Sequence, residues 1–293
     1  MRKHLDGISF RKLGDEAGFS QMSAYRRCLL ALSKLPHLAD VTRHYCNRFS
    51  GILLVDGKFV KVAGLKDKIP VIYGIDYLTH DIPTYVFSVS ENYLSLLKFF
   101  QALRLLNYPL KSIVSDDNLN IPEACFKVYP QASWQLCTNH FKENIRKSLE
   151  IRTNPFYQPF MQRIENLFRS KISLDNFNKL AKETLQDYLK DELCVRILLD
   201  IERRKSNLLA YLQVKGTPTT NNLIECFNSH LQGRLETIKG FASFKHAELW
   251  LNGYFLRRRC QKFTDCEGKF KHLNNKTSLG QTLKRNLDLP RFF

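Results

Sequence analysis

The chain of 293 residues is 44% hydrophobic and 12% aromatic, which allows a sizeable core and excludes a disordered chain. It has no uncharged apolar run of about 18 residues and no secretory signal, so we expect no membrane span, reduced cysteines and a cytoplasmic location. The net charge of +17 predicts a polyanionic partner, nucleic acid before an acidic membrane, with a solubilising surface as the alternative.

The first 48 residues predict a small helical unit. Residues 9–20 form a short amphipathic helix and a glycine-containing turn, and a second helix opens over residues 23–30 and stops before Pro36. Helix-turn-helix proteins use this spacing to place a recognition helix in a DNA groove. Tyr25, Arg26 and Arg27 are therefore candidate DNA contacts, although any helical hairpin with a glycine turn has the same pattern.

The pattern changes to strands after residue 50. Residues 51–62 begin with a continuous apolar run, which is typical of a strand buried on both faces. Strands at 71–76 and 83–89 follow after short connections, so these three strands should be antiparallel neighbours. Ser90 is expected to cap a helix running from Glu91 to about Asn107.

The next elements alternate between strand and helix. A fourth strand at 110–115, a short helix near 122–129 and a fifth strand at 132–136 form a unit with a parallel crossover. The result is a mixed sheet of three antiparallel and two parallel strands covered by helices. Residues 141–215 then show only helical spacing, and another helix begins at Asn221 or Asn222. The apolar positions of this helical segment are Leu167, Phe168, Ile172, Phe177, Leu180, Leu185, Leu189, Val195, Leu198 and Leu199.

Three acids, two on or directly after expected strands and one on a later helix, are candidate metal ligands. Asp56 follows four apolar residues on the expected central strand, where an unpaired carboxylate would cost several kcal/mol. Asp116, with Asp117 beside it, follows the fourth strand, which should run parallel beside the first. Glu225 lies on the later helix. Three such carboxylates suit two Mg²⁺ or Mn²⁺ ions about 3.5 to 4 Å apart.

Each acid also has an alternative explanation. Asp56-Gly57 could form a hairpin turn, Asp116 could cap the following helix, and Glu225 could be a capping acid of a first helical turn. Cys137 and His140 form a single C-x-x-H pair, which supplies two ligands where structural zinc needs four. Zinc is therefore not expected, and the alternative to a role near the site is a buried cysteine with a hydrogen-bonded histidine.

Several blocks resemble those of the Mutator-like and related prokaryotic insertion-sequence transposases with a DDE triad. They are Val55-Asp56-Gly57, Val114-Ser115-Asp116, Cys137-Thr138-Asn139-His140, Thr220-Asn221-Asn222 through Glu225 and Asn228, Gly240-Phe241, and the segment from Tyr254 to Arg259. The resemblance covers about residues 50–260. It implies an RNase H-like core with an all-helical insertion, and it identifies Asp56, Asp116 and Glu225 as the catalytic, metal-binding acids.

The sequence pattern and the resemblance together predict an organisation for the chain. The N-terminal unit would span residues 1–48, the first part of the catalytic core 49–140, the helical insertion 141–216, the second part of the core 217–260, and a basic tail 261–293. The net positive charge gathers here, since residues 234–293 contain 13 basic and 5 acidic side chains.

The implied activity is DNA transposition. Two divalent ions would serve cleavage of the element ends and transfer of the 3′ hydroxyl into target DNA. The implied partners are double-stranded DNA, with terminal inverted repeats and a target, and a second copy of the chain, in the nucleoid of a prokaryotic cell. Further candidate DNA contacts are His140, Asn222, Arg257, Arg258 and Arg259. A nuclease or resolvase on the same core, or a domesticated DNA-binding regulator without catalysis, are the alternatives.

Overall fold

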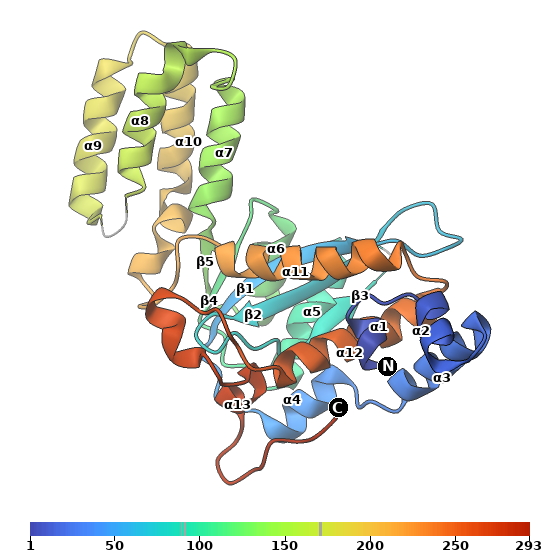
Figure 1. Ribbon diagram of the computed structural model, residues 1–293. Helices are drawn as coiled ribbons and strands as arrows, with labels where there is room; N and C mark the ends of the chain where they lie inside the picture. Colours follow the sequence, from blue (N-terminus) through green and yellow to red (C-terminus); the bar gives the residue numbers. More distant parts are fainter. Residues whose placement is uncertain (89, 91, 170–171) are drawn as a thin grey trace. The chain divides into compact units, whose positions relative to one another are not determined.

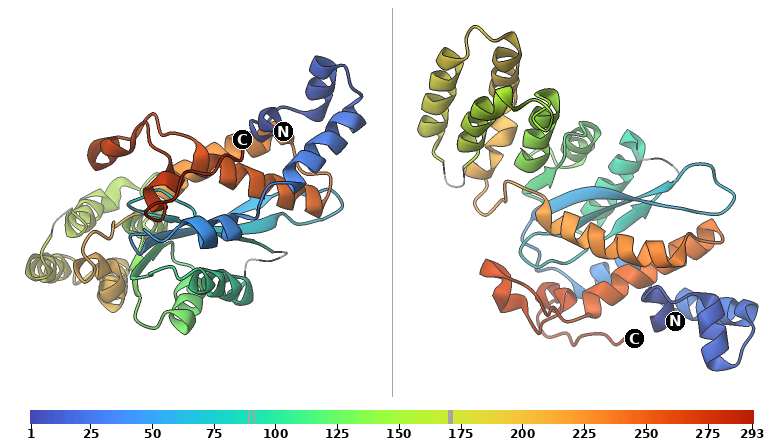
Figure 2. Two further views of the ribbon diagram at one scale, coloured as in Figure 1. Left: turned by 90° about the horizontal axis from the view of Figure 1, so that it is seen from below. Right: turned by 45° about the horizontal axis from the view of Figure 1, so that its top comes forward.

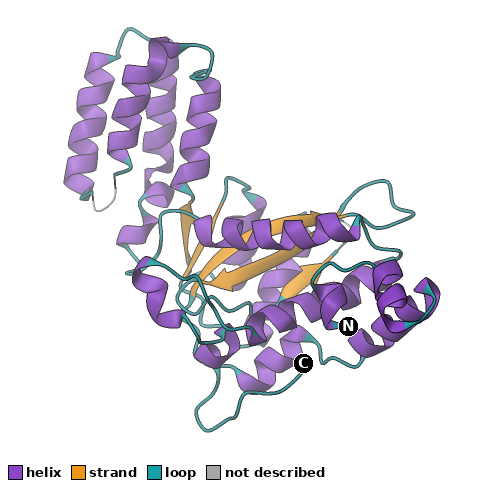
Figure 3. Cartoon of the chain, viewed as in Figure 1, coloured by secondary structure: helices purple, strands orange, loops and turns teal. Residues whose placement is uncertain are grey.

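The computed structural model describes residues 1–88, 90, 92–169 and 172–293. It shows an α/β fold in which a mixed five-stranded sheet has the order β3-β2-β1-β4-β5 (Figure 3). The strands are β1 (Ile52–Val60), β2 (Ile69–Asp76), β3 (Tyr85–Phe87), β4 (Ser112–Ser115) and β5 (Ser133–Leu136). The chain forms two compact units, one of Met1–Lys111, Asn120–Ala132 and Asn222–Phe293, and one of Ser112–Leu119 and Ser133–Asn221.

The first unit contains the antiparallel strands β1, β2 and β3, which confirms the pairing expected from the sequence. Asp56 lies opposite Tyr73 in this register, and β1 continues through Gly57 to Val60. The alternative of a hairpin turn at Asp56-Gly57 is therefore wrong. Every residue of β2 is buried, because the strand lies inside the sheet and helices cover both of its faces.

The helices of the first unit lie on both sides of its strands (Figure 2). α5 (Tyr93–Leu105) and α6 (Asn120–Val128) lie on one side, and α11 (Asn222–Ile238) and α12 (Phe244–Cys260) on the other. The start of α11 agrees with the expected start at Asn221 or Asn222. The helix cap expected at Ser90 is instead Asn92, whose side chain accepts a hydrogen bond from the Ser95 amide at 3.0 Å. Val89 and Glu91, the expected ends of a strand and a helix, lie outside the described residues.

The N-terminal segment is helical, as the sequence indicates. Its helices are α1 (Arg2–Leu5), α2 (Phe10–Ala17), α3 (Gln21–Ser33) and α4 (Leu38–Tyr45). Ser9 and Ser20 cap α2 and α3 through their side chains, and Gly18 ends α2 in the left-handed conformation with φ of 70°. Such caps satisfy the first amides of each helix. The helix-turn-helix function of this pair remains a prediction.

A buried ion pair joins distant segments of the first unit. Arg259, on α12, donates to both carboxylate oxygens of Asp81 at 2.8 and 2.7 Å, and both residues are 0% exposed. Thr42 accepts a third guanidinium hydrogen bond at 2.7 Å. Ser278 and Thr282, on α13 (Ser278–Thr282), donate to Asp81. The C-terminal segment, which also contains η3 (Gly268–Leu273), is thereby fixed to α4 and the end of β2.

The second unit contains the parallel pair β4 and β5, which agrees with the expected pairing, together with a helical bundle. Its helices lie side by side (Figure 1) and are α7 (Thr138–Ser148), η1 (Pro155–Tyr157), α8 (Gln158–Leu167), α9 (Leu174–Asp187), α10 (Glu192–Leu208) and η2 (Ala210–Leu212). Leu167, Phe177 and Leu198 are buried. Leu189 and Leu199, two other apolar positions of this segment, are 66% and 59% exposed. Within the described ranges, no helix is long and apolar enough to cross a membrane.

We expect the Arg259 to Asp81 pair to be worth much more to stability than surface pairs. Arg259→Met leaves the Asp81 carboxylate buried without its cation, which should lower the free energy of unfolding by about 3–5 kcal/mol. The control is Arg43→Met, which removes an exposed pair with Asp40 and should cost at most about 1 kcal/mol. Urea denaturation of both variants decides, and equal losses would contradict the expectation.

A buried histidine pair should make the stability of the first unit pH-dependent. The Nε2 atoms of His4 and His246 lie 3.1 Å apart, and burial lowers the pKa of His246 to about 4 and that of His4 below its ordinary value. The unfolded chain therefore binds more protons than the folded chain between about pH 4 and 6.5, and stability falls as the pH falls through this window. In denaturation series at pH 5 and pH 7, the double variant His4→Gln, His246→Gln should show a smaller loss. A loss equal to that of the parent chain would exclude this pair as a source.

Candidate active site

Asp56 lies within β1 and is half-buried. Its Oδ1 accepts a hydrogen bond from the Gly57 amide at 2.7 Å, and its Oδ2 accepts one from Nδ2 of Asn228 at 2.6 Å. The first bond is local and the second comes from α11. A carboxylate on a covered strand needs such donors to remain ionised. The sequence predicted a partner for Asp56 of positive charge, and the structure supplies an amide among its donors.

Asn228 is itself held by a buried tyrosine. Tyr73, opposite Asp56 on β2, donates its hydroxyl hydrogen to Oδ1 of Asn228. Burial raises the pKa of Tyr73 well above its ordinary value, and the nearby Asp56 carboxylate raises it further. The phenol therefore stays protonated and remains a donor. With its Oδ1 occupied by this donor, the Asn228 amide presents its NH₂ group to Asp56.

Glu225 lies three residues before Asn228 on the first turn of α11 and is half-buried. Residues three apart lie on neighbouring positions of a helix surface. The Asn228 to Asp56 bond therefore places the first turn of α11, with Glu225, against the strand that carries Asp56. Within the first unit, two of the three predicted acids thus come from elements that are hydrogen-bonded to each other.

Asp116 and Asp117 belong to the second unit and have different partners. Asp116 follows β4, and its Oδ1 accepts a hydrogen bond from the Asn118 amide at 3.3 Å. Asp117 forms an ion pair with Arg204 of α10, which raises the pKa of that arginine. Asp117 is therefore committed to a structural pair. This supports the choice of Asp116 over Asp117 as the second acid.

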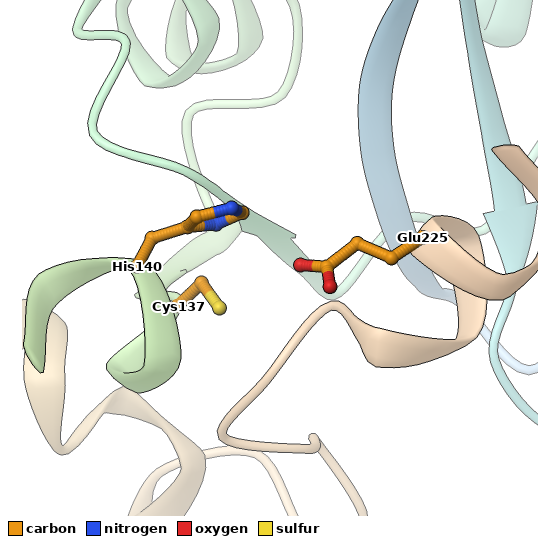
Figure 4. Close-up of side chains that lie close together, drawn as sticks. All are labelled: Cys137, His140 and Glu225. Carbon is orange, nitrogen blue, oxygen red and sulfur yellow. The ribbon is translucent and has the colours of Figure 1, made fainter. Parts of the chain in front are cut away.

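Cys137 directly precedes α7, His140 lies on the first turn of α7, and Glu225 lies on α11 (Figure 4). Cys137 is buried and donates its thiol to Oδ1 of Asn221 at 3.0 Å. The Thr138 amide donates to the Thr219 carbonyl at 2.9 Å. These bonds tie the start of α7 to the segment before α11, which gives Cys137 a structural role. His140 is half-exposed.

The candidate DNA contacts of the N-terminal segment differ in exposure. Arg26 and Arg27 are exposed on α3, and the Arg27 guanidinium lies 3.9 Å from the centre of the Phe19 ring. Tyr25 is half-buried and contacts the ring of His246 edge to face, with ring centres 5.5 Å apart. Two of the three are thus presented to solvent. Asn222, at the start of α11, is also exposed.

The three candidate DNA contacts at the end of α12, Arg257 to Arg259, do not lie on one face of the helix. Arg259 points into the core, where it pairs with Asp81 and is not available to a phosphate. Arg257 and Arg258 are half-buried. Arg257 pairs with Asp6 at 2.9 Å and donates to the Arg2 carbonyl. The three arginines have different surroundings because consecutive helical residues point about 100° apart, so three in a row cannot share one face.

The family described as "Transposase, Mutator family" matches residues 52–250, more than half of the chain. The chain belongs to the Mutator family of transposases. The matched range includes Asp56, Asp116 and Glu225, and it excludes the N-terminal helices and the arginines from Arg257 onward. As a transposase of this family, the protein is an enzyme that cuts and joins DNA.

Other comparisons add less. A solved structure, the Drosophila P element transposase strand transfer complex, is similar to this transposase with a TM-score of 0.48 and 12% sequence identity. The similarity covers 83% of this chain and 86% of that chain. No curated protein sequence matches the chain.

The hydrogen bond from Tyr73 to Asn228 should contribute measurably to stability. Tyr73→Phe leaves Oδ1 of Asn228 without this buried donor, which should lower the free energy of unfolding by about 1–2 kcal/mol. A matched control is Tyr45→Phe, because the Tyr45 hydroxyl makes no hydrogen bond within the described part of the chain. The control should change stability by less than about 0.5 kcal/mol. Chemical denaturation at neutral pH measures both, and a Tyr73→Phe loss no larger than the control would disprove the role.

Proposed function

We propose that this transposase is of the DDE type, with Asp56, Asp116 and Glu225 as its catalytic acids on an RNase H-like core. The single observation that carries the proposal is the hydrogen bond from Asn228 to Asp56, because it holds the helix of Glu225 against the strand of Asp56. Two observations support Asp116 as the second acid: it directly follows β4, and its neighbour Asp117 is paired with Arg204. Residues 141–216 would be a helical insertion in this core.

The donor set suits two hard divalent cations, Mg²⁺ or Mn²⁺. Carboxylate oxygens are the ligands these ions prefer, whereas the thiol of Cys137 is a soft ligand and is already bonded to Asn221. Asp56, Asp116 and Glu225 would hold the ions. When bound, such ions supply activation of an attacking oxygen and stabilisation of the leaving oxygen in a displacement at phosphorus.

The chain's own residues prepare this site in two ways. Asn228 donates a hydrogen bond to one oxygen of Asp56, and the Gly57 amide donates one to the other. These two bonds fix the orientation of the carboxylate. Tyr73 keeps the Asn228 amide in one orientation. A carboxylate with a fixed orientation holds its ligand geometry without rearrangement, which is the requirement for preorganised catalysis.

DNA is the proposed substrate and partner. The net charge of +17 provides long-range attraction to the phosphate backbone. The helix-turn-helix-like N-terminal unit would contribute Tyr25, Arg26 and Arg27 to binding of terminal inverted repeats, and His140 and Asn222 would lie near the DNA at the start of α7 and α11. Arg257 and Arg258 would contact phosphates. Pairing of two element ends by two copies of the chain completes the proposal, on the nucleoid of a prokaryotic cell.

Single substitutions of the acids test the mechanism. Asp56→Asn, Asp116→Asn and Glu225→Gln should each reduce cleavage of element ends with Mg²⁺ by at least about a hundredfold, because each removes a charged ligand of the ions. Asp117→Asn is the matched control, and it should retain cleavage within a few fold. Gel assays of cleavage and of end joining measure the outcome.

The same assays separate the alternatives. Undiminished cutting by Asp56→Asn would refute the assignment of that acid. A nuclease or resolvase would hydrolyse DNA without joining ends. A regulator without catalysis would bind specifically in the presence of a chelator and would not cut DNA with any divalent ion.

A further inference from the structure

A cationic recess of about 400 Å³ lies in the first unit, away from Asp56. Its walls come from α11, from the end of α12 and from the segment that follows α12. Its basic side chains are His230, Arg234, Arg257, Arg258 and Lys262. The part of the chain that forms it lies largely beyond residue 250, where the match to the transposase family ends.

Arg258 is the central cation of this recess. Its guanidinium lies 4.7 Å from the centre of the Phe263 ring and 5.9 Å from that of Phe227. These rings hold the planar group through cation–π contacts and leave its N–H groups available. Burial lowers the pKa of Arg258, which shows that the surroundings compensate its charge incompletely.

The acids of the recess offset its cations only in part, since the charge of Asp265 raises the pKa of Arg258 without cancelling the effect of burial. Asp6 is engaged by Arg257 at 2.9 Å. Among the described residues, Arg234, Arg258 and Lys262 make no ion pair or side-chain hydrogen bond. Asp265 is the remaining acid, and it is exposed at the rim. The recess therefore offers a rigid guanidinium fork and further cations without matching acceptors, an arrangement that suits a phosphate group.

The recess lies apart from the proposed cleavage site. His230 and Arg234 follow Glu225 on α11 by five and nine residues, which corresponds to roughly 7 to 14 Å along the helix axis. Arg234 lies roughly half a turn around the axis from Glu225. The buried Phe227 and Leu231 face the core between these two flanks. A phosphate in the recess is therefore a different one from the phosphate cleaved at the acids.

We propose that this recess binds a backbone phosphate of DNA, with Arg258 as the bidentate ligand and His230, Arg234 and Lys262 as supporting cations. The site is independent of divalent ions and anchors the DNA at a fixed distance from the cleaved bond. The proposal rests on the function proposed above only for the identity of the phosphate as DNA. It adds a second contact point on α11.

The experiment measures binding of a labelled 30-base-pair duplex by fluorescence anisotropy in EDTA, between 50 and 200 mM KCl. Arg258→Gln should weaken binding about tenfold at 100 mM KCl and reduce the slope of log Kd against log[KCl] by about 0.9, the effect of one lost phosphate contact. Arg258→Lys should restore part of the affinity, because it keeps the charge and loses the fork. Arg234→Gln, at an exposed position, should weaken binding in the same direction.

Arg285→Gln is the matched control, because it removes one exposed arginine outside the recess. It should change affinity less than twofold. If Arg258→Gln does not fold, as judged by circular dichroism, Arg234→Gln decides. Affinity and salt slope equal to those of the control would overturn the proposal.

A second experiment measures the effect of inorganic phosphate on thermal stability. If phosphate at constant ionic strength raises the Tm of the parent chain and not of Arg258→Gln, while DNA binding is equal in both, the recess takes free phosphate and the DNA proposal fails. Binding in EDTA needs none of the ions proposed for the acids, so anisotropy of Arg258→Gln reports on the recess, whereas the cleavage assays of the acid variants report on the proposed chemistry. Normal cleavage by Asp56→Asn together with weak binding by Arg258→Gln would remove the catalytic assignment and leave the recess.

Discussion

The structure of the first unit depends on the need to satisfy a carboxylate in the middle of a covered strand. Asp56 interrupts an apolar run on β1, and burial of such a group is costly without donors. One donor comes from outside the strand: Asn228, whose hydrogen bond to Asp56 of 2.6 Å joins β1 to α11. The same contact that lowers the cost of burial brings the helix of Glu225 to the strand. Folding and the placement of the proposed catalytic groups are thus served by one interaction.

The order of strands and helices could be predicted from the sequence because hydrophobic period and turn residues act locally. The antiparallel β1 to β3 and the parallel β4 and β5 follow from apolar runs and connection lengths. The sequence does not show which of two neighbouring polar residues caps a helix: Asn92 caps α5, although Ser90 carries an equally suitable side chain. Helical spacing also defines an apolar face without showing whether a neighbour covers it, so the exposure of Leu189 and Leu199 could not be foreseen.

Residues of the candidate site could be predicted where their type is unusual for the element that carries them, and could not be predicted where their type is common there. Asp56 is conspicuous because it is charged among apolar neighbours. Tyr73 is a common residue for a strand, and only its register opposite Asp56 shows its role. The three consecutive arginines at the end of α12 resemble a single basic patch in the sequence, yet the helix turns one of them, Arg259, into the core. The cationic recess combines α11 with a segment beyond α12, and no local pattern indicates that pairing.

The buried contact of Arg259 with Asp81 has a consequence for synthesis of the protein on the ribosome. Asp81 is made early, and its guanidinium partner and the hydroxyls of Ser278 and Thr282 emerge about two hundred residues later. Until then, the carboxylate cannot enter the interior without a large penalty. The nascent chain must therefore keep the connection between β2 and β3 hydrated while most of the polypeptide is still being translated. A gene copy truncated before Arg259 would yield a chain that lacks the means to close its core.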